Sequence, residues 1–155
     1  MKPLWKKLEE LVARDIEGYT QSGSGSKSHA KGDCINPAFL IECKSTEDEE
    51  CITLKAKWFS KIVMEARQRM RMPALAFCCN REDKYIGAIR YIDVPDDIIY
   101  NLDTLNVARL KSTMKFNFKE DVGAVKVDDS VWVILNRQDF IETVKFWTED
   151  LDEGN

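Results

Sequence analysis

The sequence predicts an α/β fold in which strands and helices form packed layers. The main indication is the order of elements in residues 51–79, where a short strand, a helix of about 17 residues and a buried strand follow one another. That order is typical of a crossover connection between strands of one sheet. A second indication is a hairpin pattern in residues 33–44, just before this unit.

Length and composition favour one compact soluble domain over residues 1–155. The chain has 44% hydrophobic and 32% charged residues, which is ordinary for a globular protein. No apolar run approaches the ~20 residues of a membrane helix, and the start of the chain lacks a signal-peptide pattern. The five cysteines have no C-x-x-C spacing, so we expect free thiols in a reducing, cytoplasmic compartment and no zinc site.

Residues 4–17 have the periodicity of an amphipathic helix that Gly18 ends. Glu9 falls at the edge of its apolar stripe, whereas Glu10 falls on the solvent side. The alternative is that both glutamates are ordinary surface residues. The stripe consists of Leu4, Trp5, Leu8, Leu11, Val12 and Ile16.

Residues 21–31 read Q-S-G-S-G-S-K-S-H-A-K, which is typical of a flexible loop. The segment is either a plain connection or a loop whose hydroxyls, amides and Lys27 and Lys31 contact phosphates. His29, the chain's single histidine, is expected to be an exposed loop residue that contacts phosphate or nothing.

Residues 33–44 predict a β-hairpin that turns at Asn36-Pro37. Side chains alternate along a strand, so Leu40, Glu42 and Lys44 share one face, opposite Phe39, Ile41 and Cys43. An acid and a base therefore point the same way from a stretch that otherwise reads as buried. Charges in such surroundings need a partner, a metal ion or a catalytic role.

The remaining pattern predicts further elements in order. Residues 46–50 form an exposed acidic turn, Asn136 caps a last helix, and the acidic tail from Glu149 is frayed. Residues 96–130 have the weakest pattern, within which a helix over 105–114 is expected, with Arg109, Lys111, Lys115 and Lys119 as a second basic patch. The other expected elements are strand 51–54, helix 55–71 and strands 74–79, 85–94 and 130–135.

The charged residues suit hydrolysis of a phosphodiester, which needs a cation at the phosphate and an activated water. Residues 53–72 carry six basic side chains against Glu65 alone, although a solvated helix face would look the same. Asp33 and Glu42 could share one Mg²⁺, the metal that favours oxygen ligands. The main-chain carbonyl of Cys43 could add a ligand, and Glu9 could complete the site. On the same face as Glu42, Lys44 could orient the water or stabilise charge on the phosphate.

These residues resemble the PD-(D/E)XK nuclease motif through Asp33, Glu42-x-Lys44 and a helical Glu9. The wider pattern is similar to small phage and archaeal-type Holliday junction resolvases over residues 4–79, with a weaker match in N-R-Q-D-F-I at 136–141. It consists of L-E-E-L-V-A, Q-S-G-S-G, K-G-D, F-L-I-E-C-K-S-T and, on the next helix, K-I-x-x-E-A. One departure is Gly32, which stands where the motif has proline.

The resemblance implies a restriction-endonuclease-like core, with a central mixed sheet flanked by helices, built from residues 4–79 and 130–148. It implies a homodimer that uses Mg²⁺, or Mn²⁺ in its place, to cut four-way DNA junctions, in the host cytoplasm if a phage encodes it. Residues 80–130 would be a family-specific insertion. The catalytic set is Glu9, Asp33, Glu42 and Lys44; the expected DNA contacts are Ser24, Lys27, Lys31, Lys57, Lys61, Gln68 and Arg71.

Two other functions remain open at this point. One is a different PD-(D/E)XK endonuclease, of nicking, restriction-like or repair type, because the catalytic residues fix the chemistry and not the substrate. The other is a catalytically silent DNA-binding module. In that case the Glu42–Lys44 pair would be an exposed salt bridge of little energetic consequence.

Overall fold

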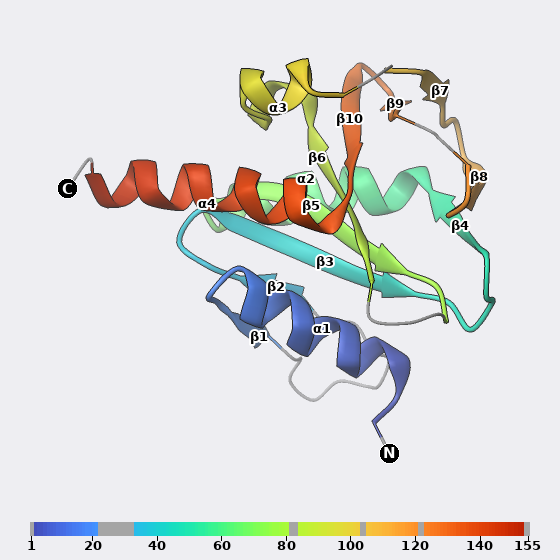
Figure 1. The fold of residues 1–155 in the computed structure, drawn as a ribbon, viewed down its shortest axis with the longest axis horizontal. Helices are drawn as coiled ribbons and strands as arrows, with labels where there is room; N and C mark the ends of the chain where they lie inside the picture. The colour runs from blue at the N-terminus through green and yellow to red at the C-terminus, as the bar shows by residue number, and fades with distance from the viewer. Residues whose placement is uncertain (1, 22–32, 81–83, 103–104, 121–122, 154–155) are drawn as a thin grey trace.

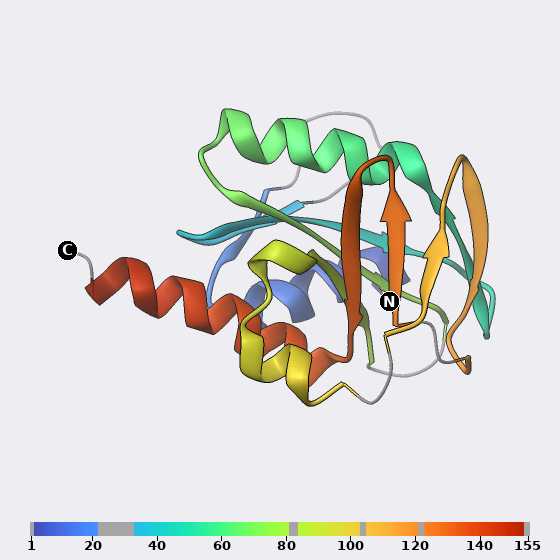
Figure 2. The ribbon, with the colours of Figure 1, turned by 90° about the horizontal axis from the view of Figure 1, so that it is seen from above.

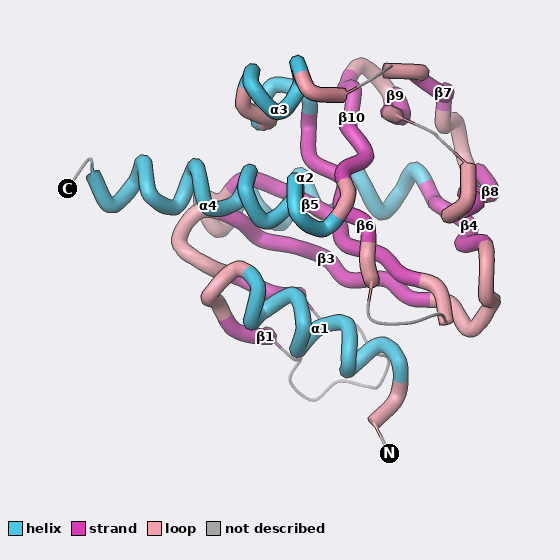
Figure 3. Tube along the Cα trace, in the orientation of Figure 1, coloured by secondary structure: helices cyan, strands magenta, loops and turns pink. Residues whose placement is uncertain are grey.

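The computed structural model describes residues 2–21, 33–80, 84–102, 105–120 and 123–153. Its helices are α1 (Leu4–Asp15), α2 (Ala56–Gln68), α3 (Asp96–Tyr100) and α4 (Arg137–Glu153), with a 3₁₀ turn η1 at Tyr91–Asp93. Its strands are β1 (Tyr19–Gln21), β2 (Asp33–Ile35), β3 (Phe39–Ser45), β4 (Cys51–Lys55), β5 (Met72–Cys78), β6 (Ile86–Arg90), β7 (Val107–Arg109), β8 (Thr113–Asn117), β9 (Ala124–Val127) and β10 (Ser130–Leu135). Figures 1 and 3 show their arrangement.

A mixed eight-stranded sheet forms the centre, in the order β1-β2-β3-β5-β6-β10-β9-β7. Strands β3 and β5 are parallel and are connected by a crossover through β4 and α2. The sequence predicted a crossover between strands 51–54 and 74–79 of one sheet, which is wrong for the first of these strands, because β4 pairs with β8 outside the central sheet. The neighbouring β2–β3 and β5–β6 pairs are antiparallel. The predicted α/β class, with a mixed sheet flanked by helices, is confirmed.

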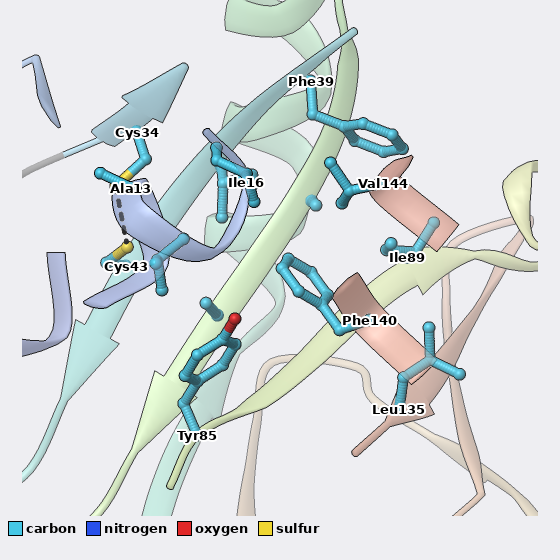
Figure 4. Packing of buried hydrophobic residues seen from close by; sticks show 14 of the residues in the cluster. Ala13, Ile16, Cys34, Phe39, Cys43, Tyr85, Ile89, Leu135, Phe140 and Val144 are labelled. Atoms are coloured by element: carbon cyan, nitrogen blue, oxygen red, sulfur yellow. Dashed lines mark hydrogen bonds between the residues drawn. The ribbon is translucent and has the colours of Figure 1, made fainter. Parts of the chain in front are cut away.

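Helices cover both faces of this sheet (Figure 2). α2 packs on one face, where its Phe59 and Ile62 join Leu40 and Leu75 in one buried cluster. α1 and α4 pack on the other face, against the opposite side chains of β3 and β5. The cluster there includes Ile16, Cys34, Phe39, Phe140 and Val144 (Figure 4). None of the helices within the described ranges is long and apolar enough to span a membrane.

Two polar clusters hold α1 and α4 in place. Asn36, buried at the predicted turn, accepts hydrogen bonds from the amides of Ala38 and Phe39, both at 2.8 Å. Its amide group donates to the Ile16 carbonyl and to the Thr148 hydroxyl, each at 3.1 Å. A buried asparagine that satisfies four partners holds one geometry firmly, because each unmade bond would cost about 1–3 kcal/mol. The turn of the β2–β3 hairpin is thereby tied to α1 and α4.

The second cluster joins the C-terminal end of α1 to the beginning of α4 and to Tyr85, just before β6. The Asp15 carboxylate accepts hydrogen bonds from Arg137 Nε at 2.8 Å and Nη2 at 3.0 Å, and from the Tyr85 hydroxyl at 2.8 Å. Burial and the bond to Asp15 raise the pKa of Tyr85 well above its ordinary value. The tyrosine therefore remains a neutral donor at physiological pH.

The segment 80–130 contains the main departures from expectation. The helix predicted over 105–114 is wrong, because this stretch forms β7, a turn and the beginning of β8. Leu110 and Met114 are spaced as in a helix, but they become inward residues once β7 pairs with β9 and β8 pairs with β4. The strand predicted over 85–94 is shorter and ends at Arg90.

The prediction of a frayed tail from Glu149 is also wrong. Helix α4 continues to Glu153 and projects past the sheet (Figure 1).

Strand β8 pairs with β4 to form a separate two-stranded ribbon. The inner face of this ribbon carries Ile52, Leu54 and Phe116, which are buried in the same cluster as α2. Phe116 packs edge-to-face on Phe77 of β5, with ring centroids 5.4 Å apart. Strand β8 thus joins β4 in a ribbon that packs in the core beside the beginning of α2.

Candidate active site

Pairing of β2 with β3 brings the first two carboxylates together. Asp33 lies directly opposite Glu42 in the antiparallel register, so their side chains project from the same face. The adjacent pair Ile35 and Leu40, two residues along each strand, packs under α2. Asp33 and Glu42 therefore face the α2 side of the sheet, as the alternation in the sequence predicts. Glu42 is 4% exposed, and a carboxylate this buried is rare unless it is paired.

A third carboxylate arrives from α2. Glu65 joins Asp33 and Glu42 in a group whose contributing oxygen atoms all lie within 4.8 Å of one another. Three negative charges at this spacing repel one another, especially around a buried member. A divalent cation bound by oxygen ligands removes that repulsion.

The lysine of the motif lies next to this group. Lys44 Nζ is 3.0 Å from Glu42 Oε2, and the Lys44 side chain is 25% exposed. Among the described residues no hydrogen-bond partner is found for this buried Oε2, so its contact with Lys44 is an ion pair alone. The ammonium also lies over the Trp58 ring, 4.9 Å from its centroid, in a cation–π contact. Contacts with Glu42 and Trp58 therefore hold the Lys44 ammonium beside the carboxylate group.

The donor set fits a hard divalent ion such as Mg²⁺. Asp33, Glu42 and Glu65 supply carboxylate oxygens, which are the ligands that Mg²⁺ prefers, and Glu42 Oε2 is a buried acceptor with unused capacity. The thiol of Cys43 points away from the group, into the cluster beneath α1, where it lies 3.8 Å from the Cys34 sulfur (Figure 4). Coordination by the main-chain carbonyl of Cys43 stays a prediction.

Glu9 is buried, at 4% exposure, whereas Glu10 is partly exposed and pairs with Lys2 at 2.6 Å. Periodicity thus distinguished the two glutamates correctly. Glu9 belongs to α1, on the sheet face opposite α2, and its main-chain carbonyl accepts a hydrogen bond from the Cys34 thiol at 3.3 Å. Among the described residues, the group of three carboxylates does not include Glu9. Its catalytic role stays a prediction.

Burial raises the pKa of Glu9 above its ordinary value of 4.5, and this effect outweighs the nearby Lys6. Folding therefore favours the protonated carboxyl, and stability falls as pH rises through and above 4.5. We expect Glu9→Gln to be more stable than wild type at pH 7, with the difference shrinking near pH 4. Urea unfolding at both pH values measures this. Equal stability of the two proteins at pH 7 would contradict the prediction.

Four of the other predicted DNA contacts lie on or just beyond α2. Lys57, Lys61 and Gln68 are exposed on α2, and Lys61 lies 3.9 Å from Glu65. Arg71 lies just beyond α2, where its Nε donates to the Asn36 carbonyl at 2.8 Å. Ser24, Lys27 and Lys31 lie outside the described residues.

Two site residues were not anticipated from the sequence. Glu65 is the single acid within the basic segment 53–72, and that isolation was the available signal. Trp58 lies seven residues earlier, on the same side of α2 as Lys61 and Glu65. Only the packing of α2 on the sheet reveals that the side of α2 with Trp58, Lys61 and Glu65 faces Glu42 and Lys44.

Two comparisons with known proteins give a match. A family model described as "Phage putative PDDEXK endonuclease" matches residues 4–146. Among solved structures, a Holliday junction resolvase (Hjc) from the archaeon Archaeoglobus fulgidus is similar with a TM-score of 0.40 and 12% identity. The match covers 69% of this chain and 82% of that one. No curated protein sequence matches.

Proposed function

This chain belongs to the phage PDDEXK endonuclease family, and from that premise we propose a Mg²⁺-dependent DNA endonuclease that prefers four-way junctions. The observation that carries the proposal is the group of Asp33, Glu42 and Glu65 with Lys44 beside it. Family membership supports phosphodiester hydrolysis. The choice of metal is supported by an all-oxygen donor set.

Each residue of the group has a distinct task in this proposal. The three carboxylates would hold Mg²⁺, which would supply Lewis acidity to neutralise charge on the phosphate and to favour deprotonation of the attacking water. The Lys44 ammonium, free of a hydrogen bond to Glu42, can contact a phosphate oxygen or orient the water. The apolar cluster under Glu42 excludes bulk solvent and strengthens these interactions.

The preference for junctions rests on the resolvase-like motifs of residues 4–79. Cutting two strands of a junction in a coordinated way needs two active sites, so the proposal includes a homodimer. Light scattering, with and without junction DNA, is expected to give a mass of two chains. A monomer under both conditions would remove the dimer from the proposal.

The central test compares four-way, nicked, flapped and linear DNA of matched sequence. With Mg²⁺ or Mn²⁺ we expect cutting at the branch point of the four-way junction and none with a chelator present. Equal cutting of linear duplex would retain the endonuclease and replace the junction preference with a restriction-like or repair activity. Binding of these DNAs without cutting, in the presence of either Mg²⁺ or Mn²⁺, would support the catalytically silent module instead.

A further inference from the structure

Trp58 contacts a second lysine besides Lys44. The Lys55 ammonium lies over the same ring, 5.9 Å from its centroid, while Lys44 lies at 4.9 Å. The two ammonium groups are therefore less than about 11 Å apart, roughly the axial rise of three nucleotides along one strand of B-form DNA. A strand that placed its scissile phosphate at Lys44 and ran toward Lys55 would bring a neighbouring phosphate within that span.

The basic surface continues from Lys55 onto the segment just before β8. Lys55 ends β4 and lies opposite Thr113 at the start of β8. The Ala56 amide donates to the Ser112 carbonyl at 2.8 Å, which fixes this end of the ribbon to α2. Lys111, two residues before Thr113, is exposed. The segment that lies outside the motif resemblance thus carries an exposed lysine next to Ser112, which bonds to the residue after Lys55.

The opposite end of the ribbon lies beside acidic residues. It adjoins the acidic turn 46–50, where the Asp48 side chain accepts hydrogen bonds from the amides of Glu50 and Cys51 at 2.8 and 3.0 Å. These bonds lower the pKa of Asp48, which keeps the turn negatively charged. Lys119 is paired with Glu50 at 2.6 Å. A polyanion is accordingly attracted to the Lys55 end and repelled from the Lys119 end.

We propose that Lys55 and Lys111, at the α2 end of the β4–β8 ribbon, bind the backbone phosphates next to the scissile phosphate. The inference rests on the proposed nuclease function and adds a binding site to it. Both positions are anchored, because the inner face of the ribbon is packed in the core and Leu110, next to Lys111 in the bend before β8, is buried in the same cluster. Contacts of this kind position the strand without reading its sequence.

The first experiment measures binding of a four-way junction and a linear duplex at several salt concentrations. Glu42→Gln is used as the background so that the DNA stays intact. Each of Lys55→Gln and Lys111→Gln is expected to reduce the salt slope by about 0.9 and to weaken binding about eightfold at 0.1 M salt. Lys119→Gln is the matched control, because that lysine is already neutralised by Glu50.

A second experiment locates the contact on the DNA. A neutral methylphosphonate replaces, one at a time, the three phosphates on each side of the scissile position. One or more of these positions should weaken wild-type binding and have little further effect on Lys55→Gln, because the two changes remove the same contact. Because Lys111 is exposed, Lys111→Gln is not expected to disturb folding. Thermal unfolding tests whether both lysine variants are folded.

The outcomes separate the two proposals. If wild-type protein cuts DNA while both lysine variants keep its affinity and salt slope, the ribbon site is overturned and the nuclease stands. The ribbon site is likewise overturned if Lys119→Gln weakens binding as much as Lys55→Gln does. If wild type neither binds nor cuts any of the DNAs, the nuclease and the ribbon site fall together.

Discussion

Replacing Glu42 with glutamine is expected to reduce Mg²⁺-dependent cleavage by roughly a thousandfold or more, and Asp33→Asn is expected to do the same. Both carboxylates face one another from paired strands and belong to the oxygen group that fits the cation. Losing a metal ligand forfeits several kcal/mol of charge stabilisation in the transition state, which corresponds to that change in rate. Affinity for junction DNA should be retained, since these side chains carry no positive charge to the phosphates.

Cleavage rates under single-turnover conditions, together with binding of the intact junction, measure both halves of this prediction. Glu10→Gln is the matched control, because Glu10 is a carboxylate of α1 that pairs with Lys2 and lies outside the group. Cleavage by either site variant at the rate of the control would show that the site has been assigned to the wrong residues.

Replacing Glu65 with glutamine is expected to lower cleavage by roughly tenfold to a hundredfold and to raise the Mg²⁺ concentration needed for half-maximal activity. The magnitude is that of a lost supporting partner at a metal site. Removing one of three charges leaves Asp33 and Glu42 to hold the ion, so activity should be reduced and not abolished. The loss should be partly recovered at high Mg²⁺.

Comparison with Glu9→Gln makes this prediction decisive, because the sequence resemblance assigns the third carboxylate to Glu9 while the structure groups Glu65 with the pair. Calorimetric titration of Mg²⁺ into the protein without DNA supplies a readout besides activity. Weaker Mg²⁺ binding by Glu65→Gln and unchanged binding by Glu9→Gln would support the group described above. The reverse result would restore Glu9 as the third ligand.

Much of the site could be predicted because it is encoded locally. Alternation along residues 39–44 places Glu42 and Lys44 on one face, and the Asn36-Pro37 turn sets the register that puts Asp33 opposite Glu42. Helical periodicity alone identified Glu9, and not Glu10, as the buried glutamate. Each of these inferences needs only residues within about ten positions of one another, where strand and helix geometry fix side-chain direction.

The strands β7 and β8 could not be predicted for the opposite reason. Their partners are β9 and, more than fifty residues earlier, β4. A segment with apolar residues at both helical and strand spacing takes the conformation that its partners offer, and strand propensity depends strongly on such context. The expected helix over 105–114 failed because the competing signal lay elsewhere in the chain.

The sequence by itself therefore determined the α/β class, the hairpin and the pairing of Asp33 with Glu42 and Lys44, because backbone geometry and turn chemistry act over short distances. The tertiary structure alone decided that α2 lies over that hairpin. This placement turns Glu65 toward the two carboxylates, and Trp58 toward both Lys44 and Lys55. It does so through the burial of Phe59 and Ile62 against the sheet, a packing interaction between distant residues that no local pattern specifies.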